Sequence, residues 1–140
     1  MKEKADLVKG WLRKASSDLV AMEASRQAGA LDACCFHAQQ AVEKLLKAFL
    51  VYHDVDFPFT HNLARLLKLA TDADAACRAL EEAARTLTPY AVELRYDHEF
   101  WPDSASAEEA CSLAGNSWDL LTGRLPEEFA GSTPGPPEDT

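Results

Sequence analysis

Four neighbouring residues, Arg95, Tyr96, Asp97 and His98, bring together an arginine, an acid and a histidine where one predicted element ends. Histidine suits acid–base work because it exchanges a proton near neutral pH, so Arg95 and His98 are the candidate catalytic pair of a ribonuclease. Tyr96 and Asp97, which stand between them, are candidate binding residues. In the alternative, Arg95 pairs with an acid such as Asp97 or with carbonyl groups at a helix end. Tyr96 would then pack beside Trp101 with its hydroxyl at the surface.

A polar strip of candidate binding residues follows one side of a helix predicted over residues 31–53. The strip comprises His37, Gln40, Lys44 and Lys47. Residues three or four apart stand in a row on a helix, so these side chains share one face. The alternative is a solvated face on which Glu43 and Lys47 form an exposed ion pair of small value. No Gly-rich phosphate loop occurs in the sequence, so phosphate binding would depend on this strip alone.

His61 is a further candidate binding residue, preceded by Thr60 and followed by Asn62. A histidine in the first turn of a helix can also hydrogen-bond across a loop to a neighbouring element. We favour this second role for His61, with the helix over residues 31–53 as its partner.

The cysteines lack the paired spacings of zinc or thioredoxin-like sites. They are Cys34, Cys35, Cys77 and Cys111. Cys34, Cys35 and His37 lie close in sequence, but adjacent helical positions point about 100° apart and cannot easily chelate together. We therefore expect no metal and no other cofactor, and cysteines that are reduced and buried.

The net charge of −9 argues against a monomer that binds nucleic acid through a broad basic surface. The charge is unevenly distributed: residues 1–68 carry ten Lys/Arg and eight Asp/Glu, whereas residues 69–140 carry four and fifteen. The acidic half can repel RNA, attract a basic partner or simply keep the protein soluble. No apolar run is long enough to cross a membrane and the N-terminus lacks a secretory signal, so we expect a cytoplasmic protein.

Hydrophobic periodicity predicts an all-α fold, an up-and-down bundle of four main helices plus one short helix. The main helices are expected over residues 5–27, 31–53, 74–96 and 106–125, and the short one over residues 61–70. Pro89 should break the third main helix near Thr88, because proline cannot donate the backbone hydrogen bond. Residues 1–125 would form the bundle, and residues 126–140, rich in Pro, Gly and acid, a disordered tail.

Several residues are predicted to start or stop these helices. Gly29 suits a left-handed C-terminal cap, which joins the first two helices into a hairpin. Asp32, Thr60 and Ser106 are expected to cap the N-termini of the helices that follow them.

The run from Phe36 to Ala48, FHAQQAVEKLLKA, closely resembles the second-helix signature of HEPN domains (higher eukaryotes and prokaryotes nucleotide-binding). Three further parts agree in order and spacing, over about residues 5–122. They are the first-helix residues Trp11, Ala15, Asp18 and Leu19, the His61-Asn62-Leu63 entry to the next helix, and Arg95-Tyr96-Asp97, in which Asp97 stands where the family usually has Pro.

This resemblance implies an all-α homodimer whose shared cleft holds the second-helix strip and the Arg95 element. Short prokaryotic members are commonly encoded beside a minimal nucleotidyltransferase and bind it in a toxin–antitoxin-like pair, which is our leading hypothesis. Ribonuclease members use an Arg and a His separated by four to six residues, whereas two residues separate Arg95 and His98. A metal-independent RNA-cleaving toxin is therefore the alternative, and a nucleotide-binding regulatory domain is the third.

Overall fold

The computed structural model describes residues 3–130, without the side chains of Arg95 and Ala130. Over these residues the chain forms helices and no strand, which confirms the predicted all-α class. The α-helices are α1 (Lys4–Ala28), α2 (Leu31–Tyr52), α3 (Leu63–Ala73), α4 (Glu81–Leu87), α5 (Glu93–Tyr96), α6 (Ser104–Gly123) and α7 (Glu127–Ala130). Two 3₁₀ segments, η1 (Ala75–Leu80) and η2 (Thr88–Ala91), flank α4.

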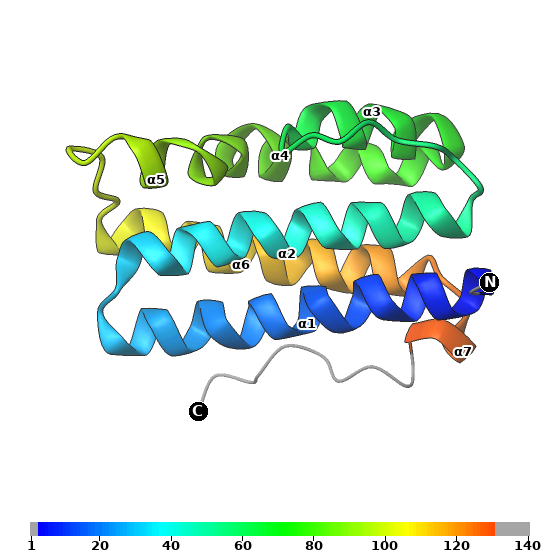
Figure 1. Ribbon diagram of the computed structural model, residues 1–140, viewed down its shortest axis with the longest axis horizontal. Helices are drawn as coiled ribbons and strands as arrows, with labels where there is room; N and C mark the ends of the chain where they lie inside the picture. The colour runs from blue at the N-terminus through cyan, green and yellow to red at the C-terminus, as the bar shows by residue number, and fades with distance from the viewer. Residues whose placement is uncertain (1–2, 131–140) are drawn as a thin grey trace.

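Helix α2 is the centre of the bundle, as its long uninterrupted pattern predicts. It packs against α1 and α6 on one side and against α3, α4 and η2 on the other (Figure 1). Its fully buried side chains include Leu45, Leu46, Phe49 and Leu50, which meet leucines from every long helix in one core. One helix thus contributes to both layers of the bundle.

The link between α1 and α2 is as predicted. Gly29 adopts a left-handed conformation with φ of 80°, and its backbone N–H donates to the carbonyl of Arg26 at 3.1 Å. Glycine takes this conformation without the steric cost that a Cβ would impose. Two long helices therefore reverse direction within two residues and form an antiparallel hairpin.

The third main helix is broken at the predicted place. Pro89 lies in η2, directly after α4, and the chain then restarts as the one-turn helix α5. Thr88 supports the break, because its hydroxyl donates to the carbonyl of Ala84 at 2.6 Å and accepts from the N–H of Leu63 at 3.2 Å. This segmented path carries α5 to the end of the bundle near the α1–α2 link (Figure 1).

The helix starts differ from the predictions. Helix α3 is capped by Asn62, whose Oδ1 accepts from the N–H of Ala64 at 2.9 Å, whereas Thr60 accepts only from the N–H of Asn62. Helix α6 is capped by Asp103, whose Oδ1 accepts from the N–H of Ser106 at 2.8 Å. These contacts lower the pKa of the Asp103 carboxyl.

Asp32 does not cap α2. The N-cap position is Ala30, where no side chain bonds to the free backbone N–H groups. Asp32 instead lies within the first turn, where its negative charge interacts favourably with the positive end of the helix dipole.

The first residues of the expected tail are helical. Helix α7 lies against α1 and α6, and Phe129 is buried with its ring 5.5 Å from that of Tyr52. The packed bundle thus extends to α7, and the rest of the expected tail, residues 131–140, is outside the described residues. Of the helices described, none is long and apolar enough to cross a membrane.

Candidate functional site

Two members of the polar strip bind an aspartate on the facing helix. Asp18 projects from α1, where one carboxylate oxygen lies 2.9 Å from Nδ1 of His37 and the other 2.5 Å from Nζ of Lys44. The Asp18 and Lys44 side chains are only 10% and 22% exposed. An ion pair so shielded from water interacts more strongly than a surface pair, so this contact fastens α1 to α2.

Lys47 belongs to a second, more deeply buried cluster. Its Nζ donates to Oε2 of Glu43 at 3.0 Å, and the two side chains are 8% and 5% exposed. The prediction of an exposed Glu43–Lys47 pair is therefore wrong. The covering residues are aromatic: the Lys47 ammonium lies 5.3 Å from the ring centre of Trp11 and within 6 Å of Phe57 and Phe59.

Glu43 also receives the predicted histidine. Nδ1 of His61 lies 2.9 Å from Oε1 of Glu43, so His61 bonds across the loop to α2 as expected. Nε2 of Gln39 donates to the same carboxylate oxygen at 3.2 Å and to the carbonyl of His61 at 3.1 Å. Gln40, the remaining member of the strip, donates to Oε1 of Gln39 at 2.7 Å. The loop before α3 is thereby tied to the centre of the bundle.

The charge on Glu43 is stabilised by its partners. Burial by itself raises the pKa of the carboxyl, because a charged group loses its hydration. Hydrogen bonds from His61, Lys47 and Gln39 outweigh this effect and hold the pKa below its usual value. Glu43 is therefore a carboxylate that accepts hydrogen bonds, a structural role and not that of a proton donor.

The sequence analysis paired Glu43 with Lys47 but expected that pair to be exposed, and it identified no acceptor role for Asp18. A usable signal is present, because Asp18 lies three residues after Ala15 and next to Leu19, within the apolar stripe of α1. Likewise Glu43 adjoins Val42 and follows Gln39 by one helical turn. A carboxylate at a buried position of a helical pattern needs partners, which the neighbouring cations supply.

The Arg95 element lies apart from these clusters. Its helix, α5, ends at Tyr96, and Oδ1 of Asp97 accepts from the N–H of Glu99 at 3.0 Å. The indole N–H of Trp101 donates to the carbonyl of His98 at 2.9 Å, which closes a tight turn. Asp97 and His98 are exposed. The side chain of Arg95 is outside the part of the chain that the structure describes, and so is its predicted pairing with an acid or a carbonyl group.

A shallow groove of about 370 Å³ separates α5 from the first turns of α2. Leu94 lines one side, and Asp32, Ala33 and Phe36 line the other. Lys47 is fourteen residues beyond Ala33 on α2, which is about 21 Å along the helix axis. His37 lies at the α5 end of the strip, whereas Lys47 lies far along α2 and His61, in the loop before α3, contacts Glu43. Among the described side chains, Lys47 and His61 therefore do not join Asp97 and His98 in one site.

Three large apolar side chains within ten residues of the chain, in and beside α5, are exposed to solvent, and together we call them the α5 patch. They are Val92, Tyr96 and Trp101, which are 49%, 78% and 70% exposed. Val92 and Tyr96 are one helical turn apart, and the N–H of Tyr96 donates to the carbonyl of Val92 at 3.2 Å. Such a concentration of exposed apolar and aromatic side chains is typical of a protein-binding surface.

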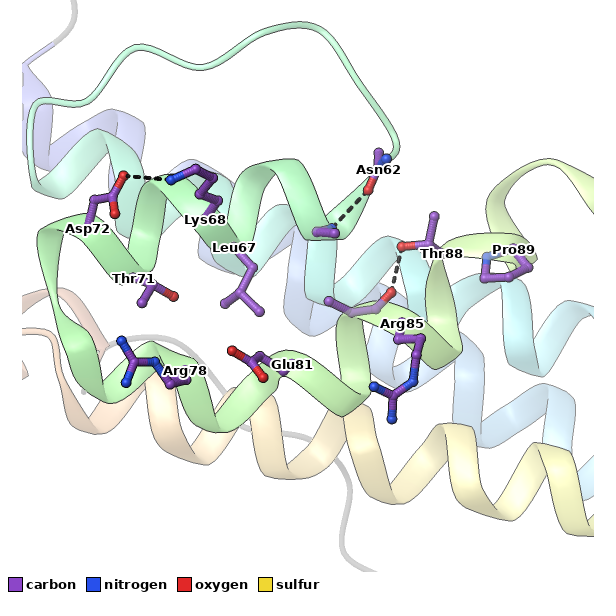
Figure 2. Close-up of a pocket in the computed structure, with 12 residues that line it drawn as sticks. Asn62, Leu67, Lys68, Thr71, Asp72, Arg78, Glu81, Arg85, Thr88 and Pro89 are labelled. Atoms are coloured by element: carbon purple, nitrogen blue, oxygen red, sulfur yellow. Dashed lines mark hydrogen bonds and ion pairs between the residues drawn. The ribbon is translucent and has the colours of Figure 1, made fainter.

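A second groove, of about 670 Å³, lies between α3 and the η1–α4 segment (Figure 2). Leu67 and Ala84 contribute apolar surface to it. Charges of both signs surround them: Lys68, Asp72, Arg78, Glu81 and Arg85. Lys68 and Asp72 pair at 3.7 Å across one turn of α3. Of the predicted site residues whose side chains the structure describes, none lines this groove.

The cysteines were expected to be buried, and three of the four are. Cys34, Cys35 and Cys77 are buried, and Cys111 is half-buried. Burial raises the pKa of both the Cys35 and the Cys77 thiol to about 11, so these two are protonated at neutral pH. Within residues 3–130, no three His, Cys, Asp or Glu side chains are grouped as metal ligands.

Comparison with known proteins agrees with this architecture. The model of the HEPN domain family matches residues 8–124. The crystal structure of an archaeal HEPN homologue superposes with a TM-score of 0.67 and 21% sequence identity. The matched region covers 89% of this chain and 98% of that one, and at this identity the likeness concerns the fold. A search of curated proteins found no match.

Proposed function

Because this chain belongs to the HEPN domain family, we propose that it is a non-catalytic interaction module that pairs with a minimal nucleotidyltransferase in a toxin–antitoxin-like system. The proposal includes a homodimer acting in the cytoplasm. Its partner class comes from the gene neighbourhood that is common among short prokaryotic members of the family. The binding surface that we propose on this chain is the α5 patch.

The α5 patch is the observation that carries the proposal. Tyr and Trp are over-represented among the residues that contribute most to protein–protein binding, because they bury a large rigid area while keeping one polar group. Tyr96 and Trp101 are both more than two-thirds exposed in the single chain. A partner that covers them removes apolar surface from water, which favours association.

The contacts of the polar strip also favour an interaction module over a nucleotide-binding domain. A cation that binds phosphate must be available to it, whereas Lys44 and Lys47 each already contact a carboxylate within 3.0 Å. Releasing either lysine would leave Asp18 or Glu43 without its positive partner in a shielded position, which is costly. These side chains therefore act in stability, and the contacts that they make argue against a role in ligand binding.

Four exposed glutamates on α4 and α6, which we call the acidic rim, add negative charge to the surface of the protein. Glu108 and Glu109 are exposed in the first turns of α6, shortly after Trp101, and Glu81 and Glu82 are exposed at the start of α4. Exposed charges of one sign steer an oppositely charged partner and raise the association rate more than the affinity. The proposed partner accordingly presents a basic surface around an apolar centre.

The test measures binding of the purified chain to the purified minimal nucleotidyltransferase encoded beside it, by isothermal titration calorimetry. We expect Trp101→Ala and Tyr96→Ala each to weaken binding roughly tenfold or more, as for other aromatic hot spots. Phe59→Ala is the matched control, because Phe59 is 93% exposed but lies before α3, away from α5. Absence of any complex, or equal binding by all variants, would overturn the proposal.

Charge reversal tests the acidic rim separately. Glu108→Lys combined with Glu109→Lys should slow association and reduce its dependence on salt concentration, with little change in the dissociation rate. An unchanged association rate would remove the rim from the proposal and leave the α5 patch.

A second candidate function, metal-independent RNA cleavage, depends on His98. Its side chain is exposed at the end of α5, three residues after Arg95, where a substrate can reach it. Incubation of the protein with a mixed RNA pool, with Arg95→Ala and His98→Ala as parallel samples, distinguishes the two functions. We expect intact RNA in every sample, whereas cleavage lost in both variants would replace the interaction module by a ribonuclease.

A further inference from the structure

Two cysteines that are far apart in the sequence meet inside the bundle. Sγ of Cys34, in the first turn of α2, lies 3.4 Å from Sγ of Cys111 in α6, across a sequence separation of 77 residues. Cys34 is fully buried, and Cys111 is half-buried. Cys111 is therefore the partly exposed residue of the pair, and Cys34 is the buried one.

Small side chains bring the two helices close together at this point. Ala107, Ala110 and Ala114 surround Cys111 on α6 at helical spacing and are all fully buried. Helix α6 packs along α2, as the two neighbouring ribbons in Figure 1 show. A disulfide has an S–S distance of about 2.05 Å, so the sulfurs need to approach by only about 1.4 Å. Side-chain rotation can supply a movement of this size.

We propose that Cys34 and Cys111 are an oxidative modification site, which a low-molecular-weight disulfide such as oxidised glutathione converts into an intramolecular disulfide. The thiolate of Cys111 attacks one sulfur of the oxidant, which forms a mixed disulfide and releases one glutathione thiolate. Cys34 then loses its proton to solvent and attacks Sγ of Cys111, which releases the second glutathione thiolate. Two protein thiols are oxidised, and the oxidant disulfide is reduced to two thiols.

The order of the two steps follows from access and acidity. Cys111 reacts first because its side chain is partly exposed. The hydrogen bond with Cys111 and burial both strongly raise the pKa of the Cys34 thiol, so its reactive thiolate is scarce at neutral pH. The second step is therefore slow near pH 7 and accelerates as the pH rises. Cys35 and Cys77 are both fully buried and stay reduced.

The crosslink would fix one wall of the groove between α2 and α5. Ala33, which lines that groove, is adjacent to Cys34 in the first turn of α2. Joining α2 to α6 there holds the start of α2 in place beside α5. The site is independent of the proposed function, because it needs neither the α5 patch nor a nucleotidyltransferase.

The experiment treats the full-length native protein with oxidised glutathione, denatures it in acid and counts the remaining thiols by alkylation and mass spectrometry. We expect the number of free thiols to fall from four to two, with a Cys34–Cys111 crosslinked peptide and full reversal by dithiothreitol. The reaction should run faster at pH 8.5 than at pH 7, by at least the roughly tenfold that one pH unit of ionisation supplies. Crosslinking should also raise the melting temperature, because the disulfide closes a long loop.

Three variants make the result decisive. Cys77→Ala is the matched control, and it should form the crosslink at the native rate. Cys111→Ser should lose the reaction entirely, and Cys34→Ser should stop at one glutathione bound to Cys111. Four unreacted thiols in the native protein, a stable glutathione adduct without a crosslink, or a crosslink that includes Cys35 or Cys77 would each overturn the proposal.

Discussion

Nζ of Lys47 lies 3.0 Å from Oε2 of Glu43, one helical turn apart on α2, and both side chains are almost completely shielded from water. A pair at this spacing on an open helix face contributes only a few tenths of a kcal/mol. Here the rings of Trp11 and Phe57 lie within 6 Å of the lysine ammonium, and the carboxylate accepts further hydrogen bonds from His61 and Gln39. Loss of one partner is therefore expected to cost much more stability here than at an exposed pair of the same spacing.

Removing one charge of this pair should be severely destabilising. We expect Glu43→Ala to lower the free energy of unfolding by about 3–5 kcal/mol, because Lys47 is left buried without its counter-charge. Urea unfolding followed by circular dichroism measures this change. The matched control is Asp72→Ala, which breaks an exposed pair with Lys68 at the same spacing and should cost less than about 1 kcal/mol.

The double variant Glu43→Leu/Lys47→Met distinguishes the contribution of the ion pair from that of the other hydrogen bonds to Glu43. Apolar residues of similar volume can replace a buried ion pair with little loss, so this variant should recover most of the stability lost in Glu43→Ala. If the double variant is as unstable as Glu43→Ala, the hydrogen bonds from His61 and Gln39 dominate, and the ion pair is secondary.

The stability of the protein should depend on pH through Glu43. Its pKa in the folded protein lies below the ordinary value of 4.5, so its contribution is present above that value. The contribution is lost as the pH falls through the folded-state pKa. Glu43→Gln should therefore be less stable than the native protein at pH 7, and the difference should shrink below about pH 4.5. A difference that stays constant between pH 7 and pH 3 would contradict this assignment.

Asn62 should contribute more than Thr60 to the stability of the protein, because Asn62 caps the start of α3. Asn62→Ala removes the acceptor for the N–H groups of Ala64 and Arg65 and should cost about 1 kcal/mol. Thr60→Ala removes one exposed contact to the N–H of Asn62 and should cost clearly less. Paired denaturant titrations give the comparison, and a larger loss in Thr60→Ala would return the cap to the residue predicted from the sequence.

Nucleotides should not stabilise the protein through Lys44. Its ammonium group already pairs with Asp18, so ATP or GTP should leave the melting temperature of the native protein unchanged. Lys44→Ala should lower the melting temperature by several degrees with or without nucleotide, because Asp18 loses a shielded partner. A nucleotide that raises the melting temperature of the native protein but not of Lys44→Ala would favour the nucleotide-binding alternative.

Features that depend on a single residue's covalent structure were predictable from the sequence. Gly29 ends α1 because glycine tolerates a positive φ, and Pro89 interrupts its helix because proline lacks an N–H. The choice of Asn62 over Thr60 as a cap was not predictable in this way. Both residue types cap helices, and the path of the preceding loop decides which side chain reaches the free N–H groups.

The candidate site was harder to predict than the fold. A three- and four-residue spacing places Lys44 and Lys47 in one row, but it does not say what covers that row. The cover comes from Trp11 on another helix and from the loop residue Phe57, whereas the nearby Phe59 is 93% exposed. Burial of this kind depends on contacts between distant parts of the chain, which helical periodicity does not contain.

The tight link at Gly29 also sets the order in which the chain can fold. It joins α1 and α2, which are adjacent in sequence and share the most extensive interface of the bundle, so little chain entropy is lost in bringing them together. Helix α6 must return to α2 from far along the chain. The α1–α2 hairpin can therefore form during synthesis, before the C-terminal half leaves the ribosome, and the docking of α6 completes the fold.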